Sequence, residues 1–296
     1  MNHIGEIAAL ATACAWTSTA MMFETTSKKV GSMPVNLIKL VFAFVLIGIF
    51  SYFSRGLFLP LDASPNAWFW LVLSGLIGFS FGDFFLFKSF TIVGARISLL
   101  VMTMVPPLSA FIGWIFLDEK LSLMNFAGMV LVMAGILIVV LSKKDKNSRI
   151  RLNHSLKGIL FALGGALGQA AGLVCSKYGM GSYNAIASTQ IRTIAGAVGF
   201  AIIITAMRRW PSVKKATLDK KVMQMLLLAS FIGPFIGVSL SLYALQHTST
   251  GVASTLMATT PILIIVPSVL IYKQKVKMKE IFGAIISVMG VLLFFL

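Results

Sequence analysis

The chain contains, at residues 96–122, the stretch RISLLVMTMVPPLSAFIGWIFLDEKLS, and its second half contains a counterpart, GVASTLMATTPILIIVPSVLIYKQKVKM, at residues 251–278. Each stretch is an apolar span with a proline near its middle. Each is closed by a polar turn and followed at once by another apolar span. An offset of 155 residues places Pro106 on Pro261. Because internal repeats show that one structural unit recurs, nearly the whole chain is interpreted as two copies of one unit.

The composition is that of a membrane protein. Hydrophobic residues make up 58% of the chain and charged residues 11%, and the mean hydropathy is +0.93. Soluble domains have roughly 45–50% apolar and about 25% charged residues. In a soluble protein the net charge of +16 would suggest nucleic acid. Here the charges lie in short connections between apolar spans, so we expect anionic lipid headgroups as the partner and no nucleic acid.

Ten segments are long and apolar enough to cross a membrane, which takes about 20 apolar residues. Backbone groups in lipid must be satisfied within the segment, so we expect these spans to be helices. The ten spans are 4–23, 34–53, 67–87, 97–117, 123–141, 157–176, 185–207, 222–244, 251–272 and 278–296.

The expected fold class is therefore all-α integral membrane, with ten transmembrane helices in two five-helix repeats. Because five is odd, the first helix of the second repeat enters from the opposite side, and the repeats are inverted. We expect a first repeat at 1–141, a basic connector at 142–156 and a second repeat at 157–296.

Lysine and arginine are concentrated on one side of these spans. The odd-numbered connections and their edges hold 20 of the 25 basic residues, whereas the even-numbered connections hold Arg55, Lys120 and Lys177. Short loops on the cytoplasmic side carry the excess of positive residues. The bias predicts that the odd-numbered connections are cytoplasmic and that both termini lie outside.

The chain resembles the ten-helix, EamA-type members of the drug/metabolite transporter superfamily. The resemblance rests on the acidic turn 118–122 and on three features that both repeats share. These are a proline in the fourth span (Pro106 and Pro261), the glycine spacing of the fifth span (Gly128 and Gly135 with Gly283 and Gly290), and a basic residue early in the second span (Lys39 with Arg192). It implies a secondary transporter in a bacterial cell (inner) membrane. Family members are usually described with both termini cytoplasmic, which differs from the charge bias.

Ionisable residues inside membrane spans are costly and are candidates for function. Lys39 and Asp83 lie near span ends that face the same side, so the two are expected to pair, with Asp83 as a protonatable coupling residue and Lys39 as its partner or an anion site. The alternative is that Lys39 reaches the interface and Asp83 meets water. Arg192 is expected near the opposite face, where it either binds a carboxylate or phosphate or anchors its helix at the headgroups.

Prolines and polar side chains within the spans indicate a central cavity. Pro106, Pro107, Pro261 and Pro267 each remove a helical hydrogen bond and favour kinks, and kinked helices in corresponding places of two repeats mark transport sites; the alternative is a bend needed only for packing. Polar candidates for lining the cavity are Trp16, Asn36, Thr103, Gln169, Gln190, Tyr243 and Thr260, which serve equally well as contacts between helices. The phenylalanine cluster at 79–87 is interpreted as lipid-facing or core.

These features favour a secondary transporter that moves a small polar organic metabolite, an amino acid or related solute, by alternating access. The resemblance suggests export. An antiporter or uptake carrier for an anionic or phosphorylated metabolite, using Lys39 and Arg192, is one alternative. An integral-membrane enzyme or a scaffold without transport is another. We find no catalytic set, metal-ligand spacing or phosphate-binding loop in the sequence and expect no cofactor. We expect protons as the coupling ion and a monomer as the functional unit.

Overall fold

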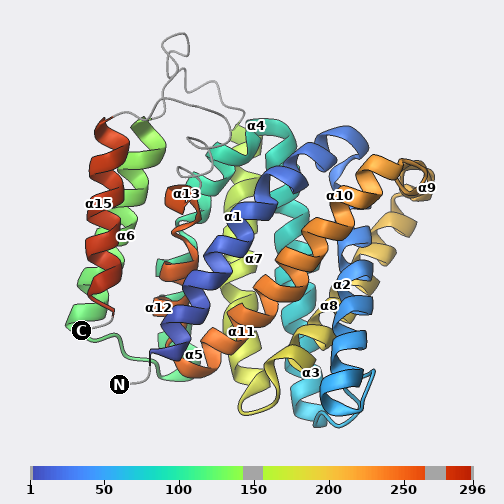
Figure 1. Cartoon of the computed structure of the whole chain (residues 1–296), viewed down its shortest axis with the longest axis horizontal. Coiled ribbons are helices and arrows are strands. Elements are labelled where there is room, and N and C mark those ends of the chain that lie inside the picture. The colour runs from blue at the N-terminus through green and yellow to red at the C-terminus, as the bar shows by residue number, and fades with distance from the viewer. Residues whose placement is uncertain (1–2, 143–155, 264–277, 295–296) are drawn as a thin grey trace.

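The computed structural model describes residues 3–142, 156–263 and 278–294, and every regular element within these residues is a helix (Figure 1). The first repeat has α1, α2, a third crossing built from α3, the π-helix η1 and the first part of α4, and then α5 and α6. Their bounds are Ile4–Val30, Ser32–Arg55, Pro65–Gly75, Leu76–Asp83, Phe84–Met102, Val105–Leu117 and Leu123–Ser142.

The second repeat follows the same plan, with one added short helix, α9, before its third crossing. Its elements are α7, α8, α9, α10, the π-helix η2, α11, α12, α13 and α15, with bounds Leu156–Met180, Ala185–Ala206, Trp210–Leu218, Lys220–Ser230, Phe231–Gly237, Val238–His247, Thr250–Met257, Thr260–Leu263 and Met278–Leu292. Helices lie at the positions of all ten expected spans, although the ninth span is described only to Leu263.

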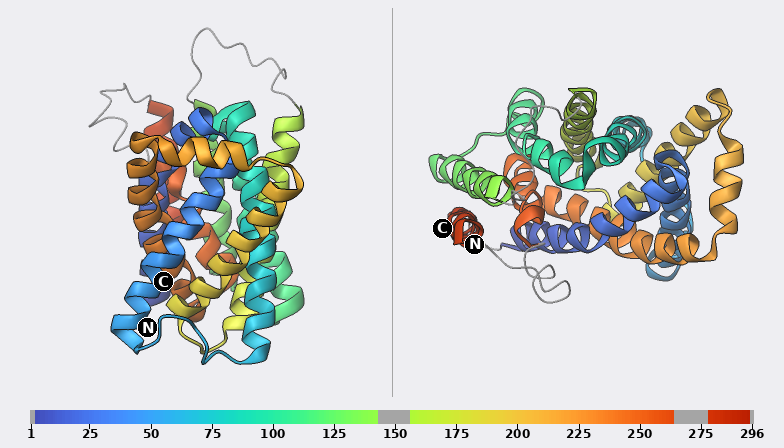
Figure 2. Two further views of the ribbon diagram at one scale, coloured as in Figure 1. Left: turned by 90° about the vertical axis from the view of Figure 1, so that its right-hand side faces the viewer. Right: turned by 90° about the horizontal axis from the view of Figure 1, so that it is seen from above.

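Five helical stretches are long and apolar enough to cross a membrane by length and composition: 32–55, 65–93, 156–180, 185–206 and 220–247. The segments 105–117, 123–138 and 281–292 are shorter apolar helices. The two repeats run in opposite directions, because α1 begins at the end of the bundle where α15 finishes, whereas α7 begins at the other end (Figure 1). The short helix α9 lies at that other end, away from the chain termini (Figures 1 and 2).

The connection between the third and fourth spans is a sharp bend within α4. The Ser89 and Ser98 hydroxyls are 2.6 Å apart, although nine residues of straight helix would separate them by about 13 Å. The chain therefore reverses between these serines, and the fourth crossing begins in the second part of α4.

The fourth and ninth spans are interrupted rather than kinked. We expected the prolines to bend continuous helices, but α4 ends at Met102 and α5 begins at Val105, with Pro106 and Pro107 in its first turn. Proline fits there because the first N–H groups of a helix have no partner within it. The second repeat breaks at the same offset of 155, between α12 and α13, and Pro261 lies in α13. Pro267 lies outside the described residues.

A π-helix occupies the same place in each repeat. η1 begins at Leu76 and η2 begins at Phe231, which is 155 residues later. Each packs against the first helix of the other repeat: η1 against α7 and η2 against α1. A Cβ atom on Gly168 of α7 would lie 2.6 Å from the Cα of Gly82, so only glycine permits this approach. On the other side, a Cβ on Gly237 would lie 3.1 Å from the indole of Trp16.

Helices α6 and α15 form a pair at one side of the bundle (Figures 1 and 2). The glycine spacing noted in the sequence forms this contact. A Cβ on Gly135 would lie 2.4 Å from the Gly283 carbonyl oxygen, and a Cβ on Gly290 would lie 2.8 Å from the Gly128 carbonyl oxygen. Small residues let helices approach closely in lipid, where packing drives association.

Candidate functional site

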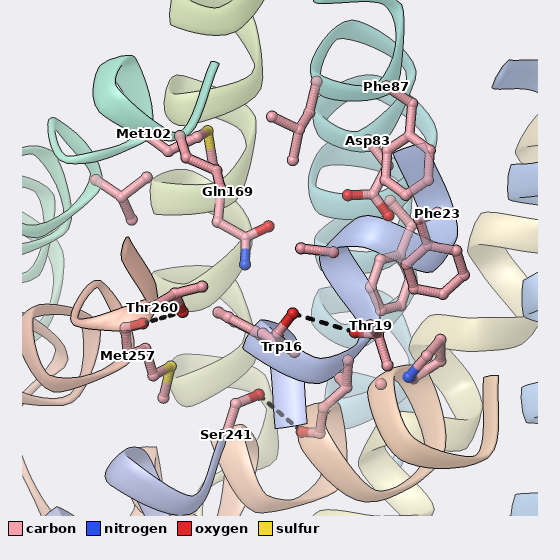
Figure 3. Close-up of a pocket in the computed structure, with 18 of the residues that line it drawn as sticks. Trp16, Thr19, Phe23, Asp83, Phe87, Met102, Gln169, Ser241, Met257 and Thr260 are labelled. Carbon is pink, nitrogen blue, oxygen red and sulfur yellow. Dashed lines mark hydrogen bonds between the residues drawn. The ribbon is translucent and has the colours of Figure 1, made fainter. Parts of the chain in front are cut away.

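A cavity of about 180 Å³ lies between the two repeats, walled by α1, α2, η1, α4, α7, α8, η2, α11, α12 and the start of α13 (Figure 3). Pockets for drug-sized ligands are larger, roughly 300–1,000 Å³. The breaks in the two interrupted helices face this space, because Met102 and Thr103 line it from one repeat and Met257, Ala258 and Thr260 from the other. The cavity suits a small molecule.

Seven of the ten polar and charged residues predicted to form the site line this cavity. They are Trp16, Lys39, Asp83, Thr103, Gln169, Arg192 and Thr260. Trp16 and Gln169 are equivalent positions of the two repeats at an offset of 153, and they approach the cavity from α1 and α7 (Figure 3).

The other three predicted residues do not line the cavity. Asn36 is buried and its side-chain amide donates to the Ser32 carbonyl at 3.0 Å. Gln190 donates to the Phe58 carbonyl at 2.7 Å. The Tyr243 ring is partly exposed and packs against His247, with ring centroids 4.4 Å apart. The contacts of Asn36 and Tyr243 lie within their own helices. Gln190 connects α8 to the loop after α2, which is the packing role that such polar groups also serve in membrane proteins.

Lys39 and Asp83 form the ion pair expected from their positions in the sequence. The Lys39 Nζ donates to the Asp83 Oδ2 at 2.7 Å, and the two side chains are only 6% and 11% exposed. The ammonium also lies 4.1 Å from the centroid of the Phe87 ring and 5.4 Å from that of Phe23. Because aromatic faces attract cations, the pair is held in a defined place on one wall of the cavity.

Arg192 lies in the same cavity. The expectation that it lies near the opposite membrane face is therefore wrong. Arg192 is the eighth residue of α8, as Lys39 is of α2. Each is therefore about 10 Å along helices that enter from opposite ends, and both reach the middle of the bundle. Arg192 is 2% exposed, and its guanidinium carbon lies 4.8 Å from the centroid of the Phe79 ring.

The aromatic wall was missed in the sequence, where the phenylalanine cluster was interpreted as lipid-facing or core. Phe79 and Phe87 line the cavity, whereas Phe81 is exposed on the outside of the bundle. The spacing from Phe79 to Asp83 and from Asp83 to Phe87 is four residues in each case. That spacing places residues on one face of a helix. It was the sequence feature from which the two phenylalanines beside Asp83 could have been predicted.

A set of polar contacts between the repeats lies below the cavity, toward the end that carries the chain termini; we call it the floor. The hydroxyls of Ser109 and Ser254 are 2.6 Å apart. Beyond them, Glu119 accepts a hydrogen bond from the Thr250 backbone N–H at 2.9 Å and forms an ion pair with Lys177 at 2.6 Å. The floor thus joins α5 and the turn after it to α7 and α12.

A second set of contacts joins the repeats at the surface of the same end. Arg55 forms an ion pair with Asp62, and the Tyr183 hydroxyl donates to Asp62 at 2.8 Å. Burial raises the pKa of Tyr183, and its hydrogen bond to Asp62 raises it further. The pKa of Asp62 lies below its ordinary value: burial acts to raise it, but the hydrogen bond from Tyr183 and the charge of Arg55 outweigh this effect.

Comparison with known proteins identifies the chain's relatives. The model of the EamA-like transporter family matches residues 3–141 and 156–296. A solved structure titled only "Crystal structure of protein" has a TM-score of 0.75 and 16% sequence identity, and the match covers 99% of this chain and 97% of that one. None of the curated proteins compared with the sequence matches it significantly. The family and the shared fold confirm an all-α integral-membrane protein with ten transmembrane helices in two inverted five-helix repeats.

Proposed function

Because the chain belongs to the EamA-like transporter family, we propose that it is a secondary transporter that exports a small polar organic metabolite, an amino acid or a related solute, by alternating access. The observation that carries the proposal is the cavity between the repeats, in which Lys39, Asp83 and Arg192 are buried together. Buried ionisable groups in a membrane protein face a pathway or a ligand. The solute binds where the two interrupted helices meet the cavity.

The floor supports an alternating-access mechanism. It closes the cavity toward the end with the chain termini, through Glu119 and its contacts with Thr250 and Lys177. In the opposite direction the lining residues extend through Phe90 and Leu99 toward the bend in α4. We propose that the two ends open in turn. Movement would occur at the helix breaks, with Pro106, Pro107 and Pro261 as gating positions, and at the two π-helices, which often mark functional sites. Pro267, the fourth predicted gating proline, lies outside the described residues.

The remaining features of the proposal follow from the sequence. The bias of lysine and arginine supports cytoplasmic odd-numbered connections and outside termini in a bacterial inner membrane, where anionic headgroups contact the basic loops. The family match to 3–141 and 156–296 supports repeats at 1–141 and 157–296 around the connector 142–156. One chain supplies both halves of the pathway, so a monomer suffices. Asp83, paired with Lys39, is the proposed site of proton coupling.

An anion carrier, working by uptake or antiport, is the second candidate function. It is favoured by one observation: Arg192 lines the cavity and makes no hydrogen bond to the described residues. The candidate differs from the first in the direction of transport and in the charge of the solute, and the assay below measures this charge.

The test is efflux from liposomes that contain the purified protein and a defined mixture of amino acids, organic acids and sugar phosphates. Mass spectrometry follows loss of each solute, with and without a pH gradient. We expect one class to leave faster than from protein-free liposomes. Asp83→Asn should remove the effect of the pH gradient, whereas Glu24→Gln, in an exposed ion pair with Lys28, should not. If no solute leaves faster than from protein-free liposomes under either condition, the proposed function is wrong.

A further inference from the structure

We propose that Arg192 binds a carboxylate group of the transported solute, and that the substrates are therefore small carboxylates, either monoanions or amino-acid zwitterions. This inference rests on the proposed function and specifies its substrate class.

The charges around the cavity do not balance. Among the described lining residues the charged ones are Lys39, Asp83 and Arg192. The single carboxylate, Asp83, pairs with Lys39 at 2.7 Å and also interacts electrostatically with Arg192. Two cations thus share one anion, and Arg192 is 2% exposed. An excess of buried charge is costly, so the protein bears a cost that an incoming anionic group would remove.

The guanidinium group of Arg192 has a donor available for a ligand. Its Nε is buried and has no hydrogen-bond partner among the described residues. The guanidinium carbon lies over the Phe79 ring, 4.8 Å from its centroid. A Cβ at Gly78 would lie 3.2 Å from the Arg192 Nη2, so a side chain there would crowd this nitrogen. The N–H donors of a planar guanidinium match the two oxygens of a carboxylate.

Gln169 adds a second unpaired polar group. Its side chain projects into the cavity from α7 (Figure 3), and it makes no hydrogen bond in the part of the chain that the structure describes. Asp83 faces the same space, and its Oδ2 alone is engaged by Lys39. An amino acid would thus find Arg192 for its carboxylate and Asp83 or Gln169 for its ammonium, while a monoanion would use Arg192 alone.

The two repeats differ in the charges that they supply to the cavity. Lys39 and Arg192 are equivalent at an offset of 153, but the residue equivalent to Asp83 in the second repeat is Val238. Val238 also lines the cavity. The first repeat therefore supplies the counter-charge for its own cation, whereas the second does not. A monoanion balances the net charge of the site, and a phosphate dianion would exceed it. A zwitterion leaves the net charge unchanged, but it places its carboxylate at Arg192 and its ammonium at Asp83 or Gln169.

The experiment measures thermal unfolding of the purified full-length protein in detergent. The probes are leucine, 4-methylpentanoate, leucinamide and isoamylamine, which share the isobutyl side chain of leucine, with the corresponding glycine and phenylalanine series and glucose 6-phosphate. A ligand that binds the folded state raises the unfolding temperature. We expect a rise of several degrees from carboxylates of at least one skeleton and none from the matching amide or amine. A rise with 4-methylpentanoate alone identifies monoanions; a rise with leucine alone identifies zwitterions.

Four variants test the residue. Arg192→Gln should abolish the carboxylate-induced rise, and Arg192→Lys should weaken it because an ammonium lacks the fork of donors. Val238→Asp should abolish it by supplying the counter-charge. Arg209→Gln, which removes the same charge at an exposed position, should leave it unchanged. Without ligand, Arg192→Gln should unfold at the wild-type temperature or above, since it removes an unbalanced buried charge; a purely structural arginine would give a lower temperature.

Three results would overturn the inference: no rise with any carboxylate, equal rises with the amides, or an unchanged rise in Arg192→Gln. A rise with glucose 6-phosphate alone would also contradict it. The liposome assay separates the two proposals. Efflux of a solute without a carboxylate, unaffected by Arg192→Gln, would leave the transport function standing and reject this substrate class. Carboxylate binding without efflux would reject the transport function and leave the carboxylate site standing.

Discussion

Loss of the Asp83 carboxylate should destabilise the protein more than loss of the Lys39 ammonium, although both changes break one contact. Asp83→Asn leaves two cations, Lys39 and Arg192, around one cavity. Lys39→Met leaves Asp83 with Arg192 as the other charged residue of the described lining. Breaking a buried ion pair costs about 3–5 kcal/mol. The pair is 6% and 11% exposed but borders a cavity, so we use about 3 kcal/mol for Asp83→Asn and roughly half of that for Lys39→Met.

These values translate into measurable shifts. For a chain of this size 1 kcal/mol corresponds to about 2 °C in unfolding temperature, so Asp83→Asn should lower it by about 6 °C and Lys39→Met by about 3 °C. The double variant should lie within about 2 °C of wild type, because replacing both members of a buried pair by neutral groups is often tolerated. The assay is thermal unfolding in detergent at one scan rate, since irreversible unfolding makes the temperature depend on it.

The sign of the coupling is the decisive quantity. A double variant more stable than the sum of the single changes shows that the two groups interact. Glu24→Gln serves as the control, because its exposed pair with Lys28 should contribute no more than about 0.5 kcal/mol. Additive single changes, or a larger loss from Lys39→Met than from Asp83→Asn, would refute the reasoning about charge balance.

Three further changes test other parts of the structure. Glu119→Gln should weaken the floor, because it removes the ion pair with Lys177. A cysteine introduced at Ser254, in a variant without native cysteines, should then react several-fold faster with a thiol reagent applied from the side of the chain termini. An unchanged rate would show that Glu119 does not hold the floor closed. Gly168→Ala should cost about 1–3 kcal/mol, because its Cβ would meet backbone at 2.6 Å, whereas Gly164→Ala meets the Phe85 ring at 3.3 Å and should cost less; equal unfolding temperatures would contradict this packing. The pKa of Asp62 is lowered from 3.8, so its carboxylate stabilises the fold above that pH and loses this effect as the pH falls through the lowered value. Asp62→Asn should therefore be less stable than wild type at pH 7 and equal to it at strongly acid pH. A stability difference that does not change with pH would be inconsistent with this ionisation.

The repeat and the spans were predictable from the sequence because both depend on local properties. Apolar length alone located the ten spans, and the offset between matching residues gave the repeat. The Lys39–Asp83 pair was also within reach, since both residues lie near span ends that face the same side. These inferences needed no knowledge of how helices pack.

Features that depend on packing between repeats were not predictable. Pro106 indicates a disturbed helix, but the choice between a kink and a break depends on what surrounds it; here a buried Pro106 begins a new helix beside the cavity. The π-helices leave no clear mark in composition. Arg192 was placed near the wrong face because helices from opposite ends overlap in the middle of the bundle, which a count of residues from one end does not show.

The comparison of the repeats separates the parts of the protein that are duplicated from those that are not. The helix breaks after Met102 and Met257, and the π-helices that begin at Leu76 and Phe231, recur at the same offset of 155. These are the elements that the proposed movement requires in both halves, since each end of the pathway must open in turn. The cation is also duplicated, but its counter-charge is not, because Val238 stands where the first repeat has Asp83. We propose that the symmetric elements provide access from two sides. The asymmetric charge gives the cavity one excess positive charge, and we propose that this difference between the copies selects the solute.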